Sequence, residues 1–421
     1  MWTDLPAAVT EALERLHVRG FSAFLVGGCV RDLLRGVKPH DYDLTTSATP
    51  QEIKAAFSDK NVVETGIRHG TVTVFSHHMP LEITTFRKDG TYSDGRHPDG
   101  VSFAKDIKED LSRRDFTVNA MAWSPKDGLV DLFGGREDLQ NGVIRCVGEP
   151  VIRFREDALR ILRGLRFSSQ LCFAIEKQTA TAMRECTPLL EQVSRERIAD
   201  EFIRLLCGPG VEAVLTEYRH IIAFFVPELQ AGQNGEFPGA KLVSAVPPVP
   251  LLRLSAFFYG RVDVAVAETV LKRLRTEKKL IRGVTCLLRE SASFPWAMDD
   301  PTALRLLQRV PADLVQPLLD LMGGIASAEA DPSISMQSIE EWAGQIHRLL
   351  ASSPCLSVAD LAVTGDDLLQ MGCPAGESIG KILRTLLEDV TDGKIPNQPE
   401  ALKSNVKKLL ESSAHTVLKN D

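Results

Sequence analysis

The alternation of apolar and polar residues divides the chain into a strand-containing N-terminal part and a helical C-terminal part. Short β-branched or apolar runs predict strands at 22–26, 41–45, 71–75 and 81–86, and the short polar turn between the last two is typical of a hairpin. From residue 151 onwards, apolar residues recur at the spacing of one helix face. The pattern therefore predicts an α+β head followed by an all-α C-terminal region.

Local signals place several helices and loops more closely. Thr49-Pro50-Gln51-Glu52 combines an N-cap, a proline at the first helical position and a glutamate three residues after the cap, which predicts a helix start. A helix is expected through 151–167, because Ala158, Ile161, Leu162 and Leu165 fall on one face of it. Further helices are expected at 194–206, 251–260 and 270–290, a loop at 89–100, an inter-helix linker at 236–250 and a break near 331–333.

Length and composition limit the class of protein. A chain of 421 residues with 44% hydrophobic and 25% charged residues is typical of a globular protein of two to four domains. No run of about 18 uncharged apolar residues predicts a membrane span, and the N-terminus lacks a basic-then-apolar signal pattern, so we expect a cytoplasmic protein. The net charge of −7 argues against general coating of nucleic acid, although it leaves a local basic patch open.

The eight cysteines are scattered along the chain and include no Cys-x-x-Cys pair. This distribution favours buried thiols in a reducing compartment over a disulfide framework or a zinc site.

A glycine pair lies at the predicted boundary between the first strand and a helix. In VGGCVRDLLRGVKPHDYDL, residues 26–44, Gly27 and Gly28 follow the strand and Arg31 lies one turn into the helix. Glycines let backbone N–H groups approach a phosphate closely, and a following helix favours negative charge at its start. A glycine pair that merely ends a strand is the alternative interpretation.

Two carboxylates follow the glycine pair. Residues two apart in a strand share a face, so Asp41 and Asp43 are expected side by side, with Glu82 of the predicted hairpin as a third carboxylate. Like charges held together favour a cation between them, and hard ions such as Mg²⁺ prefer carboxylate oxygens and phosphates. By itself, however, an Asp-x-Asp pair is most often a solvated turn.

Four segments, in this order, carry a resemblance to a known family: VGGCVRDLLRGVKPHDYDL (26–44), SRRDFTVNAMAW (112–123), DLFGGREDL (131–139) and REDALRILRGLRF (155–167). They resemble the class II template-independent nucleotidyltransferases, a family of CCA-adding, A-adding and CC-adding tRNA nucleotidyltransferases and bacterial poly(A) polymerases. The resemblance implies a nucleotidyltransferase palm, a small mixed sheet flanked by helices. We expect a head at 1–150, a helical neck with the base-recognition helix at 151–208, a helical body at 209–330 and a tRNA-binding tail at 331–421.

The resemblance also implies roles for single residues. The family's phosphate-binding pair corresponds to Gly28 and Arg31, with Gly27 beside them, and its metal-binding carboxylates to Asp41 and Asp43. Its nucleotide-contacting positions correspond to Arg114, Asp115, Asp157, Arg160, Arg163 and Arg166, with Asn119 expected on the same helix as Asp115. Ion pairs of Arg113 and Arg114 on the surface, and a solvated basic face for any single arginine, are the alternatives.

Asp157 and Arg160 have a physical reason to choose the base. On a helix the two residues are i and i+3, about 60° apart, so an acceptor lies beside a donor fork. Cytosine and adenine both present an amino donor next to a ring acceptor, whereas uracil and guanine present the reverse order and would leave polar groups unpaired. Spacing alone also fits an ordinary helix ion pair; the family context favours base recognition.

Two further segments bear on the choice within the family. The stretch DGTYSDGRHPDGVSF (89–103) resembles the intact loop of enzymes that add A, and TGIRHGTVTVF (65–75) resembles CCA-adding enzymes more than poly(A) polymerases. We therefore expect CCA addition to tRNA from CTP and ATP with Mg²⁺, by two-metal nucleotidyl transfer and without an obligate protein partner. Alternatives are an A-adding enzyme, a poly(A) polymerase, a small-molecule nucleotidyltransferase and a non-catalytic RNA-binding protein.

Overall fold

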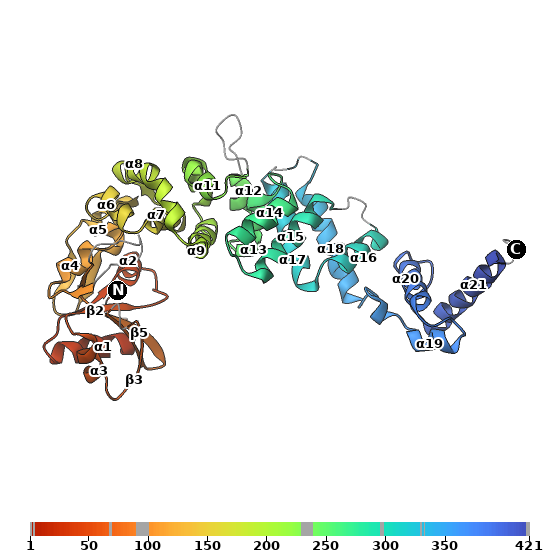
Figure 1. Ribbon diagram of the computed structural model, residues 1–421, viewed down its shortest axis with the longest axis horizontal. Coiled ribbons are helices and arrows are strands. Elements are labelled where there is room, and N and C mark those ends of the chain that lie inside the picture. The colour runs from red at the N-terminus through yellow and green to blue at the C-terminus, as the bar shows by residue number, and fades with distance from the viewer. Residues whose placement is uncertain are drawn as a thin grey trace. The chain divides into compact units, whose positions relative to one another are not determined.

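The computed structural model describes residues 2, 5–66, 70–89, 101–228, 239–294, 299–328, 331 and 333–417 (Figure 1). The chain forms two compact units. The first contains the residues up to Ala240 together with 248–253 and 269–277, and the second contains 241–247, 254–268 and the chain from Lys278 on. The finer division into head, neck, body and tail stays a prediction.

The first unit is built on a seven-stranded sheet in the order β3-β4-β5-β2-β1-β8-β9. Only β2 and β5 pair in parallel; the other neighbours are antiparallel, so the sheet is mixed as predicted. The hairpin of β4 and β5 is confirmed, whereas the strand predicted at 41–45 begins at Asp43. The strands are β1 (Ala23–Val26), β2 (Asp43–Thr46), β3 (Asn61–Gly66), β4 (Thr71–Ser76), β5 (Met79–Thr85), β8 (Met121–Ser124) and β9 (Gly128–Asp131).

Helices cover both faces of this sheet. All four residues of β1 are buried: Leu25 packs in the cluster that contains α1 (Ala7–Val18), α2 (Gly28–Leu34) and α3 (Pro50–Ala56), and Phe24 packs in the cluster that contains α4 (Ile107–Ser112). Neighbouring strand residues point to opposite faces, which explains the two clusters. The predicted capping box at the start of α3 is confirmed by reciprocal hydrogen bonds between Thr49 and Glu52.

Helices and short turns follow the head. The single helix predicted through 151–167 is wrong, because α6 ends at Glu156 and α7 begins at Leu159. The remaining elements of this part are β6 (Arg87–Asp89), β7 (Val101–Phe103), η2 (Thr117–Asn119), α5 (Gly135–Asn141), β10 (Val143–Ile144), α6 (Pro150–Glu156), α7 (Leu159–Leu171), β11 (Ala174–Ile175), α8 (Lys177–Cys186), η3 (Thr187–Gln192), α9 (Arg195–Leu206), α10 (Val211–Glu217) and α11 (Arg219–Phe225).

The rest of the described chain is helical, as predicted. The continuous helix expected at 270–290 is wrong, because the chain breaks after Arg273 and Arg275 adopts a positive φ of 56°. The elements are α12 (Ala240–Ala245), α13 (Pro250–Phe258), α14 (Val264–Arg273), α15 (Lys278–Ala292), α16 (Asp300–Arg309), α17 (Ala312–Ser327), α18 (Met336–Ala351), η4 (Val358–Asp360), α19 (Gly365–Gln370), α20 (Glu377–Thr391) and α21 (Pro399–Val417).

Two loop predictions are only partly testable. The stretch expected as a linker at 236–250 contains α12, so it is helical over 240–245, and its first residues lie outside the described part. Residues 90–100 of the predicted loop also lie outside it.

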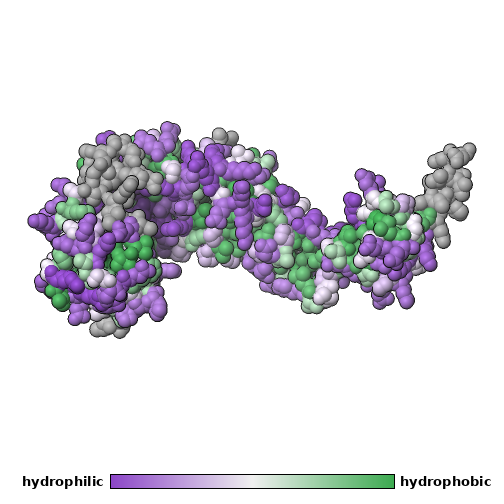
Figure 2. Space-filling model, turned by 60° about the horizontal axis from the view of Figure 1, so that its bottom comes forward, coloured by the Kyte–Doolittle hydropathy of each residue, from purple (hydrophilic) through white to green (hydrophobic). Residues whose placement is uncertain are grey.

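The polarity of the surface and the burial of the cysteines can be compared with the expectations from the sequence. Hydrophilic side chains dominate the face drawn in Figure 2, with smaller hydrophobic areas between them. Among the described residues, no helix is long and apolar enough to span a membrane. All eight cysteines are free thiols, as predicted, but only four of them are buried and Cys172 is exposed.

Candidate active site

The chain turns at Gly27, directly after β1. Gly27 has φ 77° and ψ −135°, a conformation that favours glycine, and its N–H donates to the carbonyl of Met121 in the neighbouring strand over 3.3 Å. A Cβ at this position would lie 3.0 Å from Nη1 of Arg114. The glycine therefore lets the Arg114 guanidinium lie directly against the turn between β1 and α2.

Arg31 points from α2 toward the segment that carries Arg114. Its Nη1 donates to Oδ1 of Asn119 over 2.8 Å, and its Nε donates to Oδ1 of Asp32 over 2.9 Å. Its guanidinium carbon lies 5.5 Å from the centre of the Phe167 ring. The side chain is thus held by groups from three different segments, in an orientation that the sequence alone did not indicate.

The three predicted carboxylates lie in the region where β2 begins. Asp43 is the first residue of β2 and lies in register opposite Glu82 of the parallel strand β5. Asp41 precedes β2, so the expectation that both aspartates belong to the strand is wrong. Removal from water raises the pKa of Asp43 to about 6, the charges of Asp41 and Glu82 add to the increase, and Arg114 opposes it.

This excess of negative charge bears on metal binding. No group of three or more His, Cys, Asp and Glu side chains in the described part of the chain is close enough together to hold a metal ion. Removal from water is the largest cause of the raised pKa of Asp43, and Asp41 and Glu82 add a smaller repulsion that a divalent cation would relieve; carboxylate oxygens suit such an ion. The donor chemistry of Asp41 and Asp43 therefore fits a metal that completes its shell with other ligands.

Asp115 is the buried centre of the next motif. Its Oδ2 accepts from Nε and Nη2 of Arg163 over 2.8 and 2.6 Å, and its Oδ1 accepts from the N–H of Phe116. Burial alone would raise the pKa of Asp115, but the Arg163 guanidinium outweighs it and lowers the pKa to about 2. Asn119 lies in the 3₁₀ turn η2 instead of the expected helix, and its Nδ2 reaches Oδ1 of Asp115 over 3.5 Å.

The arginines before Asp115 are paired as well. Arg113 and Arg114 both contact the fully buried carboxylate of Asp110, over 2.7 and 3.3 Å. The surface ion pairs considered from the sequence are therefore ion pairs to an interior group. The two guanidinium groups are therefore oriented by Asp110.

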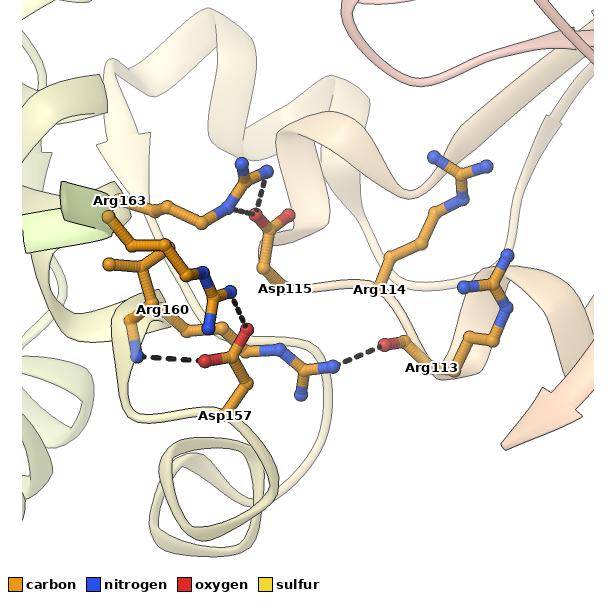
Figure 3. A pocket seen from close by; sticks show the side chains of 8 residues that line it. Arg113, Arg114, Asp115, Asp157, Arg160 and Arg163 are labelled. Carbon is orange, nitrogen blue, oxygen red and sulfur yellow. Dashed lines mark hydrogen bonds and ion pairs between the residues drawn. The ribbon is translucent and has the colours of Figure 1, made fainter. Parts of the chain in front are cut away.

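A cavity of about 280 Å³ opens beside these residues (Figure 3). Its lining combines five arginines with two aspartates, which favours an anionic ligand that also presents hydrogen-bond donors. The lining residues are Arg113, Arg114, Asp115, Asp157, Leu159, Arg160, Arg163 and Arg197. Five of the predicted nucleotide-binding residues, from positions 114 to 163, thus lie around one cavity.

The geometry of Asp157 and Arg160 differs from the prediction. Asp157 is extended, with φ −145° and ψ 105°, and its Oδ1 accepts from the N–H of Leu159 over 3.0 Å. An aspartate side chain that accepts from the N–H two residues later competes with helical backbone hydrogen bonds, which accounts for the break between α6 and α7. The i, i+3 pairing of Asp157 and Arg160 on one helix is therefore wrong, although both residues line the same cavity.

The two side chains instead have separate partners. Oδ2 of Asp157 accepts from Nη2 of Arg197 in α9 over 2.9 Å. Arg160 contacts Glu156 over 2.6 Å and donates to the carbonyl of Arg113 over 3.1 Å (Figure 3). The guanidinium that contacts the Asp157 carboxylate in the structure is thus Arg197.

Sequence reasoning missed Arg197, and Arg166 lies apart from the other predicted arginines. The sequence predicted a helix at 194–206 but no role for Arg197, whose i, i+4 spacing from Glu201 on α9 is the available signal. Arg166 does not line the described cavity: its Nε donates to Glu201 over 2.6 Å, and its guanidinium lies 4.1 Å from the Phe167 ring centre. Burial lowers the pKa of Arg166.

Three family models match parts of this chain. Residues 23–145 match a family described as Poly A polymerase head domain, residues 172–232 a family described as probable RNA and SrmB-binding site of polymerase A, and residues 255–406 a family described as tRNA nucleotidyltransferase domain 2.

Similar proteins span nearly the whole chain. A CCA-adding enzyme of Enterococcus faecalis is 36% identical over 96% of this chain and 97% of its own length. One of Lactiplantibacillus plantarum is 35% identical over 98% and 99%. The crystal structure of the Bacillus stearothermophilus CCA-adding enzyme in complex with CTP superimposes with a TM-score of 0.78 at 29% identity, covering 98% of this chain and 100% of that one.

Proposed function

The chain belongs to the CCA-adding enzyme family, and we propose that it adds CCA to the 3′ ends of tRNA from CTP and ATP without a nucleic-acid template. The observation that carries the proposal is the cavity in which the Asp157 carboxylate lies among guanidinium groups. Arg114 lines this cavity and also acts on the charge of Asp43, so base, phosphates and carboxylates are served by one continuous set of residues.

The transfer step is a displacement at phosphorus. The 3′-hydroxyl oxygen of the tRNA forms a bond to the α-phosphorus, the bond to the oxygen that bridges to the β-phosphorus breaks, and pyrophosphate leaves while the hydroxyl proton is released. Gly27, Gly28 and Arg31 receive the phosphates at the turn after β1. Arg114 adds positive charge beside this turn.

Enzymes of this family generally use divalent metal ions. We assign the role to Mg²⁺, with Asp41 and Asp43 as its protein ligands and Glu82 beside them. Held by these carboxylates, two such ions would supply activation of the attacking hydroxyl and neutralisation of the charge on the leaving pyrophosphate.

We assign the choice of base to the cavity residues from position 157 onwards. Asp157 offers an acceptor for the amino group shared by cytosine and adenine, and Arg160 or Arg197 offers a donor for the ring nitrogen beside it. Asp115 and Asn119 serve the sugar. Uracil and guanine would leave buried polar groups unpaired, which is the physical basis for their rejection.

The proposal is tested with tRNA transcripts. Incubated with Mg²⁺, a transcript that ends at the discriminator base gains two C and one A when CTP and ATP are both present, and extension then stops. Extension of a CC-ending transcript alone would identify an A-adding enzyme, and long A tails on unrelated RNA a poly(A) polymerase. A cytoplasmic location accords with a tRNA substrate and is checked by fractionation.

A further inference from the structure

The ring of Phe167 in α7 lies among three guanidinium groups. The guanidinium carbons of Arg31, Arg163 and Arg166 are 5.5, 5.4 and 4.1 Å from the ring centre. Phe167 is only 6% exposed, and Phe116 packs against it edge to face at 5.9 Å. The ring is therefore fixed in the interior while cations from two different helices share it.

The same residues close a loop of contacts. Arg31 donates to Asn119, and Asn119 donates to Asp115. Asp115 accepts from Arg163, whose guanidinium lies over the Phe167 ring. This loop connects the phosphate side of the site with the cavity. Phe167 itself does not line the described cavity.

Three like charges near one ring repel each other unless each is balanced. Arg163 and Arg166 have Asp115 and Glu201 as partners, and Arg31 has Asp32. The negative face of an aromatic ring attracts such cations, and the attraction grows when they are removed from water. The ring thus determines where the guanidinium groups lie, in addition to filling space.

We propose that Phe167 is a positioning residue for triphosphate binding, which holds Arg31 and Arg163 in the orientation that the nucleotide phosphates meet. The inference rests on the proposed function only for the identity of the ligand. Because CTP and ATP carry the same triphosphate, Phe167 is expected to affect the binding of both nucleotides equally. Base discrimination stays with Asp157 and the residues around it.

The experiment changes the ring's charge distribution while keeping its shape. Phenylalanine analogues with one, two and three ring fluorines replace Phe167, which weakens cation binding stepwise. We expect KM for CTP and for ATP to rise by the same factor, about three- to tenfold at three fluorines, with kcat within about twofold. Selection against UTP stays unchanged, and Phe167→Tyr, which keeps the ring, retains parental KM values.

A direct binding measurement separates this inference from the proposed function. The affinity for inorganic triphosphate, measured by calorimetry, falls by the same factor as the nucleotide affinities, and the same fluorinated residues at Phe257, which faces Arg261 in another part of the chain, leave it unchanged. Unchanged triphosphate affinity along the series overturns the inference even if the protein adds CCA. A parent protein that binds triphosphate but extends no tRNA overturns the proposed function alone.

Discussion

Oδ2 of Asp157 and Nη2 of Arg197 lie 2.9 Å apart, although forty residues separate them in the chain. The other oxygen of the carboxylate accepts from the N–H of Leu159, so Asp157 is oriented from two sides. A base that binds to this carboxylate therefore meets a group whose direction α9 helps to fix. Arg197 itself lines the same cavity, so its guanidinium offers hydrogen-bond donors to a ligand there.

Replacement of Arg197 by alanine is expected to weaken nucleotide choice. Loss of a charged hydrogen-bond partner lowers kcat/KM for CTP and ATP about ten- to a hundredfold, and incorporation of UTP and GTP rises relative to them. Single-nucleotide incorporation on a tRNA transcript measures both effects. Arg204→Ala, an exposed arginine on the same helix, is the matched control and keeps parental selection. Equal losses for all four nucleotides would contradict this role.

Replacing the carboxylates at the start of β2 is expected to have a different effect on incorporation. Asp41→Ala or Asp43→Ala removes metal ligands and lowers incorporation of every nucleotide on the order of a thousandfold or more, with the fold intact. Added Mg²⁺ raises the unfolding temperature of the parent in the presence of CTP but not that of the variants. Asp59→Ala, which removes an exposed partner of Arg15, serves as control. Normal incorporation by either variant would refute the metal assignment.

The depressed pKa of Asp115 predicts a pH-dependent contribution to stability. Its folded pKa of about 2 lies below the ordinary value of 3.8, so the stabilisation is present above pH 4 and is lost as pH falls toward 2. The two values correspond to about 2 kcal/mol at pH 6 and about half of that at pH 3. Asp115→Asn therefore lowers the unfolding temperature more at pH 6 than at pH 3.

An exposed carboxylate provides the comparison for this pH effect. Arg15 lowers the pKa of Asp59 to about 2 as well, but solvent and salt screen this surface pair. Asp59→Asn is expected to change the unfolding temperature less than Asp115→Asn, and less again at high salt. A larger effect at Asp59 would show that the Asp115 contact with Arg163 does not stabilise the fold.

How far the sequence predicted the site depends on the kind of contact. The turn at Gly27 and the nearness of Glu82 to Asp43 were expected from the residues, although their register in parallel strands was not. Arg114, Asp115 and Arg163, which line one cavity, were grouped only by the family resemblance. The break at Asp157 was missed because helix periodicity continues across it, while the hydrogen bond from the Leu159 N–H to the Asp157 side chain is visible only in three dimensions.

The contacts of Arg197, Glu201 and Phe167 lie outside what periodicity can indicate. Each depends on how α7, α9 and the head pack together. Arg166 shows the same limit: the family resemblance implied a nucleotide contact, whereas in the structure it contacts the buried carboxylate of Glu201. Tertiary partners, which no local pattern encodes, decided these positions.

The glycine at the start of α5 gives the last prediction. A Cβ on Gly135 would lie 2.2 Å from the backbone carbonyl oxygen of Thr117, a distance no structure tolerates without movement. Thr117 begins η2, the turn that places Asn119 beside Arg31 and Asp115. Gly135→Ala is therefore expected to destabilise the head by about 3 kcal/mol and to raise KM for both nucleotides. Gly344→Ala, in open space within α18, is neutral or slightly stabilising in the same unfolding measurement. If Gly135→Ala matched Gly344→Ala in unfolding temperature and in KM, close packing of α5 on η2 would not be what holds Asn119 in place.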